Sequence, residues 1–235
     1  MKARAALLAV SLLVPVGAGV ATAAPKPKPK PVPLKPVCNL VVDDKADATY
    51  NMVPGAAGDD IVSADVASDS TLITGVIRVA ALAANDPQAP FGRGYFVNFT
   101  APGSPDVLFL SARTYPTGNT FVYGYDGVDP NTGVNTSYTL GSATGVVDTA
   151  KGEVRISVPI KDLATGAKAN LAKGNKLSGL TAEVFRIAGQ GLVPSQSPAP
   201  GAPRVPLGGV LLPFDDAVGT TSYALGHPSC VAVGK

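Results

Sequence analysis

The sequence predicts an all-β domain built as an antiparallel sandwich of two sheets. Three observations carry this prediction: short segments alternate apolar and polar residues, turn-forming residues separate them, and no stretch keeps a helical period over three turns. The chain also holds 26 Gly and 22 Pro in 235 residues, which suits many turns. Eight or nine such strands indicate a single sandwich domain of the immunoglobulin-like or jelly-roll-like kind.

The clearest predicted strand is "GEVRISVP", residues 152–159. Its apolar residues, from Val154 to Val158, fall on one face, and the polar residues between them fall on the other. The same alternation predicts strands at residues 60–66, 71–82, 94–100, 106–113, 120–126, 136–141 and 180–188.

Two segments interrupt this pattern. Residues 163–173 are expected to form at most a short helix or a loop. Residues 189–209, "GQGLVPSQSPAPGAPRVPLGG", predict a long Pro/Gly-rich surface loop. A final hairpin, built from "VLLPF" and "TTSYALG", is expected after it.

The first 24 residues have the pattern of an export signal. Lys2 and Arg4 precede an apolar stretch, and small residues up to Ala24 suit cleavage there. The alternative is a retained membrane anchor, but Pro15 and the alanine-rich end favour a cleaved peptide. We therefore expect an extracellular, secreted protein, free in the medium or associated with the cell wall, with no membrane attachment after cleavage.

Residues 25–37, "PKPKPKPVPLKPV", form a Pro/Lys-rich linker ahead of the sandwich domain at 38–235. Proline favours an extended polyproline II conformation, so the linker predicts a stiff spacer of about 40 Å. It is expected to be a solvated stalk, although its lysines could also contact anionic wall polymers. From residue 38 onward the chain has 13 basic against 17 acidic residues, which argues against nucleic acid as a partner.

The only two cysteines, Cys38 and Cys230, lie at opposite ends of the predicted domain. In an oxidising compartment this favours a disulfide over two free thiols. Such a bond would bring the first and last parts of the domain within about 7 Å at their Cα atoms.

No sequence motif indicates catalysis. The Walker loop, the G-x-S-x-G elbow, H-E-x-x-H and the dinucleotide-binding glycine pattern are all missing from the chain. A Ser-His-Asp site would have to use the single histidine, His227. The only two glutamates, Glu153 and Glu183, lie within strands, and Glu153 is expected to face solvent. A secreted hydrolase is therefore the third choice of function.

Acidic residues are the candidate metal ligands. Fifteen of the 17 acidic residues are aspartates, and five fall in one short interval. Calcium takes six to eight oxygen ligands, often from loops, so these five could form a calcium site. The alternative is that aspartate simply initiates turns. The five candidate ligands are Asp43, Asp44, Asp47, Asp59 and Asp60.

An aromatic row is the candidate ligand-binding surface. Phe121, Tyr123 and Tyr125 alternate along one strand and so share a face, as a planar platform for a sugar ring would require. Core or cross-strand packing explains such a row equally, and the chain has no tryptophan.

The order of strand segments also suggests a family. The segments "VVDDKADAT", "DDIVSADVASDSTLITGVIRVAAL" and "TGVVDTAKGEVRISVPIKDL" together resemble exported bacterial modules of the DOMON and family-9 carbohydrate-binding-module group, over about residues 38–225. The resemblance implies a binding or accessory module without chemistry of its own. Because some DOMON modules hold haem between methionine and histidine, it also permits a Met52 and His227 pairing.

Taken together, the sequence predicts a secreted, non-catalytic accessory or adhesion-type binding module. The alternative is a carbohydrate-binding module, either with calcium as a stabilising ion or without it. The expected partners are a cell-wall or extracellular polysaccharide, or another secreted protein.

Overall fold

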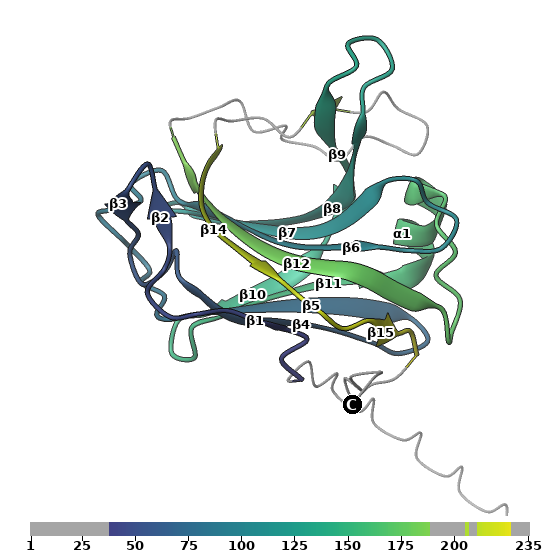
Figure 1. Ribbon diagram of the computed structural model, residues 1–235, viewed down its shortest axis with the longest axis horizontal. Coiled ribbons are helices and arrows are strands. Elements are labelled where there is room, and N and C mark those ends of the chain that lie inside the picture. Colours follow the sequence, from purple (N-terminus) through teal and green to yellow (C-terminus); the bar gives the residue numbers. More distant parts are fainter. Residues whose placement is uncertain (1–37, 189–204, 207–210, 227–235) are drawn as a thin grey trace, which may run out of the picture. The chain divides into compact units, whose positions relative to one another are not determined.

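The computed structural model describes residues 38–188, 205–206 and 211–226. Two antiparallel sheets pack face to face around one hydrophobic core (Figure 1). The predicted all-β, antiparallel sandwich is therefore confirmed.

The smaller sheet has five strands, and its neighbouring strands pair antiparallel. In spatial order they are β1 (Val41–Val42), β4 (Ile61–Ser68), β5 (Leu72–Val79), β11 (Glu153–Pro159) and β10 (Thr144–Asp148).

The larger sheet forms the second layer. Its order is β13 (Val205–Pro206), β9 (Asn135–Ser142), β8 (Gly118–Val128), β7 (Val107–Tyr115), β6 (Arg93–Thr100), β12 (Lys176–Ile187) and β14 (Leu211–Val218), with β15 (Tyr223–Ala224) also paired to β12.

Three short elements complete the described chain. The strands β2 (Thr49–Tyr50) and β3 (Val53–Pro54) form a separate hairpin at the left of Figure 1. The helix α1 (Ile160–Ala167) follows β11 and lies at the opposite end of the sandwich. It begins three residues before the segment that was expected to be a short helix or loop.

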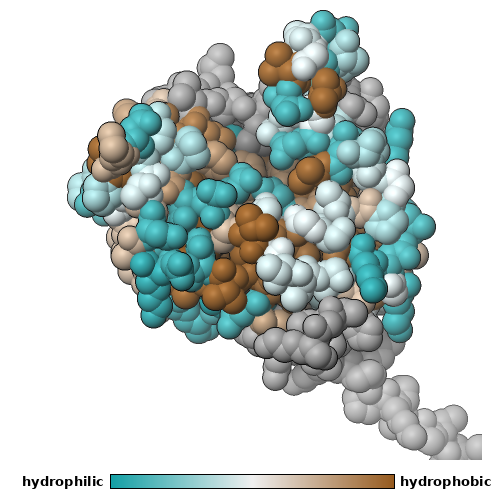
Figure 2. All heavy atoms as spheres, viewed as in Figure 1, coloured by the Kyte–Doolittle hydropathy of each residue, from teal (hydrophilic) through white to brown (hydrophobic). Residues whose placement is uncertain are grey.

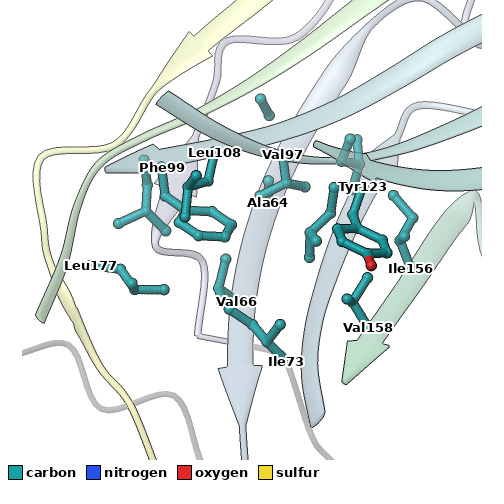
Figure 3. Close-up of a cluster of buried hydrophobic side chains, with 14 of the residues drawn as sticks. Ala64, Val66, Ile73, Val97, Phe99, Leu108, Tyr123, Ile156, Val158 and Leu177 are labelled. Carbon is teal, nitrogen blue, oxygen red and sulfur yellow. The ribbon is translucent and has the colours of Figure 1, made fainter. Parts of the chain in front are cut away.

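The core lies between the two sheets because alternate residues of each strand point inward. Figure 3 shows Val66 and Ile73 of the smaller sheet facing Phe99 and Leu108 of the larger one. All four side chains are fully buried. Burial of large apolar side chains contributes roughly 1.5–3 kcal/mol each, so this inner layer accounts for most of the stabilisation of the fold.

All eight strands predicted from alternation are present, but β10 was missed. Its sequence, "TGVVD", is short and contains Gly145. A Cβ at this glycine would lie 2.4 Å from the ring of Phe121, so the residue is required for close packing of the two layers. A glycine in this role weakens the strand pattern that sequence analysis depends on.

The predicted final hairpin is wrong. Strand β14 pairs with residues 181–187 of β12, and β15 pairs with Lys176 and Leu177 of the same strand. Between them the Gly219 N–H donates to Leu180 O at 2.8 Å, so both segments follow β12 without turning back. The predicted loop 189–209 also contains one strand, β13, which pairs with β9; residues 189–204 and 207–209 lie outside the described chain.

Strands β1 and β14 end their respective sheets, and both carry exposed apolar residues. Val42 and Val218 are each 63% exposed. Figure 2 shows hydrophobic residues in this region, among hydrophilic and neutral ones. Isolated exposed valines are ordinary on protein surfaces.

One buried hydroxyl joins the two layers at the end near β15, which gives a first prediction. The Tyr223 hydroxyl accepts a hydrogen bond from Ser68 N at 2.6 Å and lies 3.1 Å from Ser68 Oγ. Because Tyr223 is fully buried, Tyr223→Phe leaves the Ser68 N–H without this acceptor and should lower the free energy of unfolding by about 1–3 kcal/mol. Urea denaturation measures the change. The half-exposed Tyr50→Phe is the control, and equal losses for the two variants would contradict the prediction.

Candidate functional site

A pocket of about 450 Å³ opens at one end of the sandwich. Three connections form it: the β5–β6 loop, the β7–β8 turn and the β10–β11 turn. Its volume lies within the range of small-molecule sites, roughly 300–1,000 Å³.

The position of Arg93 at the pocket depends on the glycine before it. Gly92 has φ of 99°, and a Cβ there would lie 1.7 Å from Thr114 O. Only glycine allows this approach, which brings the chain from the β5–β6 loop into β6. Arg93 is consequently 4% exposed, with Nε donating to Asp59 Oδ1 at 2.7 Å and Nη2 donating to Asp86 Oδ2 at 2.6 Å.

Asp59 connects this arginine to a second one. It is fully buried and also accepts hydrogen bonds from Arg186 Nε at 3.0 Å and from Ala56 N at 2.6 Å. Burial by itself would raise the pKa of Asp59, but the hydrogen bonds from Arg186 and Arg93 outweigh it and lower the pKa. Arg186 in turn lies over the ring of Phe214 at 3.9 Å. We call Asp59, Asp86, Arg93 and Arg186 the ion network.

The ion network fixes one wall of the pocket. Asp86 belongs to the β5–β6 loop, and burial that would raise its pKa is outweighed by hydrogen bonds from Gln88 N and Arg93, so the pKa is lowered. Beneath it the Tyr95 hydroxyl donates to Gly58 O at 3.1 Å. Burial raises the pKa of Tyr95, so this phenol stays protonated.

The opening of the pocket carries neutral polar groups. Asn85 lies in the β5–β6 loop, Asn119 near the start of β8 and Thr149 in the β10–β11 turn, and all three are exposed. In the described chain, no hydrogen bond engages their side chains. Tyr115, at the end of β7, is half-buried and lines the same pocket.

A second group of side chains is acidic. Carboxylate oxygens of Asp43, Asp47 and Asp215 lie within 4.8 Å of one another. We call these three residues the acidic cluster. Asp43 Oδ2 is buried without a hydrogen-bond partner, and burial, followed by repulsion from neighbouring aspartates, raises the pKa of Asp43.

Within the acidic cluster, the carboxyl of Asp215 has the most strongly raised pKa. Its Oδ2 accepts a hydrogen bond from Ile61 N at 2.6 Å, which ties β14 to β4. Burial and repulsion from Asp43, Asp47 and Asp60 raise the pKa of Asp215 to about 7, and the Ile61 hydrogen bond only partly opposes them.

The structure thus brings together two of the five predicted calcium ligands, Asp43 and Asp47. Asp44 is exposed, and Asp60 Oδ1 accepts a hydrogen bond from Ala46 N at 2.8 Å. Asp59 is bound to arginines in the ion network and is not part of the acidic cluster. Sequence analysis missed Asp215, although a signal was present: the chain has "DD" at 43–44, at 59–60 and again at 215–216.

The predicted aromatic platform is not exposed. Tyr123 is 8% exposed, Tyr125 is 2% exposed, and Phe121 packs against the core. Figure 3 shows the Tyr123 ring between the sheets beside Ile156 and Val158. The shared face was predicted correctly, but it is the inner face of β8, so a sugar ring cannot stack on it.

The two glutamates lie on opposite sides of the molecule. Glu153 alternates with the buried Val154 in the smaller sheet, and Glu183 alternates with the buried Val184 in the larger one. Each therefore points away from the core on a different layer and cannot flank one cleft with the other. The expectation that Glu153 faces solvent is wrong: it is 8% exposed and ion-paired to Arg155.

Several predicted residues lie outside the described chain. Cys230 and His227 are among them, so the disulfide with Cys38 and the haem pairing with Met52 stay predictions. Cys38 is partly buried and packs against the core, while Met52 is 95% exposed in the β2–β3 turn.

Comparison of the chain with models of protein families, with curated proteins and with solved structures finds no match. Across the described residues, no helix is both long enough and apolar enough to cross a membrane.

The raised pKa of Asp215 gives a second prediction. In an unfolded chain its carboxyl ionises near pH 4, whereas in the fold it keeps its proton until about pH 7. Its contribution to stability is therefore full below about pH 4 and is lost as the pH rises through 7. Asp215→Asn keeps an oxygen for Ile61 N but carries no charge. Relative to wild type, the variant should gain about 1–2 kcal/mol of stability between pH 5 and pH 8, after allowance for solvent screening.

Chemical denaturation of both proteins across that pH range measures the difference. Asp162→Asn, an exposed aspartate in α1, removes the same charge elsewhere and should show no such trend. A constant difference between Asp215→Asn and wild type from pH 5 to pH 8 would contradict the assignment.

Proposed function

We propose that the chain is an exported, non-catalytic accessory or adhesion-type binding module, and that its ligand binds in the pocket at the end of the sandwich. One observation carries the proposal: this pocket lies where three connections meet on a rigid scaffold, and the buried ion pairs of Arg93 hold one of its walls. Loops held by rigid elements are where proteins commonly place binding residues. The export signal and the Pro/Lys-rich linker support an extracellular setting.

The proposed partner is a cell-wall or extracellular polysaccharide, and a secreted protein is the other possibility. The pocket favours the polysaccharide because its opening combines amide and hydroxyl groups with one partly exposed aromatic ring, that of Tyr115. This replaces the buried row at 121–125 as the proposed sugar-binding surface.

Binding to insoluble polysaccharides and to cell-wall preparations tests the proposal. Tyr115→Ala removes the aromatic wall from a partly exposed position and should weaken binding about tenfold, or ~1.4 kcal/mol. Val128→Ala is the control, because Val128 is 62% exposed but does not line the pocket. Equal retention of wild type and Tyr115→Ala on every material would exclude this pocket as the binding site.

A second candidate function is calcium binding at the acidic cluster. The specific observation is Asp43 Oδ2, a buried carboxylate oxygen without a partner beside two further carboxylates. Three carboxylates supply part of the six to eight oxygens that calcium requires, and main-chain oxygens or water would supply the rest. In this role the ion would stabilise the module by joining the 43–47 segment to β14.

Thermal unfolding at pH 8 with EDTA and then with excess calcium tests this candidate. At a calcium concentration 100 times the Kd, stabilisation of about 2.7 kcal/mol should raise Tm by ~5 °C or more. Asp47→Asn should abolish the rise, while Asp162→Asn should keep it. If the Tm of the wild type is the same with EDTA and with excess calcium, calcium binding at the acidic cluster is excluded.

A further inference from the structure

The charged side chains that line the pocket neutralise each other. Arg93 and Asp86 are the two charged lining residues, and their side chains are joined at 2.6 Å. The Arg93 guanidinium also forms an ion pair with Asp59, and Asp59 forms a second ion pair with Arg186. The ion network therefore has two positive and two negative charges, and its net charge is zero.

The opposite charges in the neighbouring β10–β11 turn also neutralise each other. Thr149 lines the pocket from the β10–β11 turn, where Asp148 and Lys151 form an ion pair at 3.3 Å. A charged ligand would thus meet no counter-charge on the pocket wall. It would lose hydration without a compensating ion pair, which disfavours charged ligands strongly.

The remaining lining groups match a ring that is apolar on its faces and hydroxylated at its edge. Asn85 and Asn119 each offer amide donors and acceptors, and Thr149 offers a hydroxyl. Tyr115 and the neighbouring Pro116 supply apolar surface. Sugar rings have this combination of apolar faces and hydroxylated edges.

Resting on the proposed binding function of this pocket, we propose that the site selects uncharged sugar units over acidic ones, and that Asp86 is the residue that sets this selectivity by neutralising Arg93. Asp86 acts through Arg93 and is therefore a positioning and charge-compensating residue. Its side chain is 14% exposed and that of Arg93 is 4% exposed, so solvent screens the pair only weakly.

Asp86→Asn follows directly as the test variant. Asparagine keeps an oxygen that accepts the Arg93 hydrogen bond, but it leaves the guanidinium charge only partly compensated. The pocket wall then becomes positive, and the affinity for an acidic sugar should rise about tenfold relative to a neutral one. That gain should weaken as salt is increased.

Asn85→Asp is the complementary variant. It places a negative charge at the pocket opening without touching the ion network, because Asn85 makes no side-chain hydrogen bond within the described chain. It should weaken binding of acidic sugars further and favour cationic amino sugars. The two variants thus move the charge preference in opposite directions, which a general loss of folding could not do.

Isothermal titration calorimetry compares the sugar affinities of the chain from residue 25 onward with those of both variants. The probes are neutral gluco-, xylo- and manno-hexasaccharides, a galacturonate hexamer and a glucosamine hexamer. Wild type should bind at least one neutral hexamer about tenfold more tightly than the galacturonate hexamer. Asp86→Asn should shrink or invert this ratio, and a thermal melt of each variant confirms that it is folded.

Two results would overturn the inference while leaving the binding function intact: a wild type that prefers galacturonate, or a folded Asp86→Asn variant with an unchanged ratio. If Tyr115→Ala also leaves binding to wall preparations unchanged, and no hexamer binds to the wild type, the proposed function fails together with the inference.

Discussion

At the end of the sandwich that carries the pocket, the structure depends on one buried carboxylate, that of Asp59. It holds Arg93 of β6 and Arg186 of β12 while accepting a hydrogen bond from Ala56 N. A buried charge is tolerated only with such compensation, and removing one partner from a buried pair costs about 3–5 kcal/mol in proteins. Because Arg93 also holds Asp86, the same carboxylate indirectly fixes the β5–β6 loop and with it the wall of the pocket.

Asp59 and Asp215 lie in opposite electrostatic surroundings. Asp59 lies between two guanidinium groups, so its pKa is lowered in spite of complete burial. Asp215 lies beside Asp43 and Asp47, so burial and repulsion act together and its pKa rises to about 7. The first environment is satisfied within the protein and therefore stabilises structure. The second holds excess negative charge, which a proton or a cation would relieve.

The sandwich explains why the residues predicted from alternation do not meet in one site. Residues that alternate inward form the core, which takes the Phe121 to Tyr125 row into the interior. Residues that alternate outward on the two sheets cannot approach each other, which separates Glu153 from Glu183. The connections at the end of the sandwich combine side chains from both sheets, and the 450 Å³ pocket lies there.

The sequence by itself determined the fold class, all eight strands with strong alternation, and the shared face of the aromatic row. These are local properties, because side chains two residues apart on a strand always point the same way. Tertiary structure alone decided that this face is buried, that β14 and β15 both follow β12, and which aspartates meet. The bond between Arg186 and Asp59 spans 127 residues, and Ile61 reaches Asp215 across 154. Contacts at such separations depend on how the strands pair and the layers pack, and the period of a single strand carries no information about either.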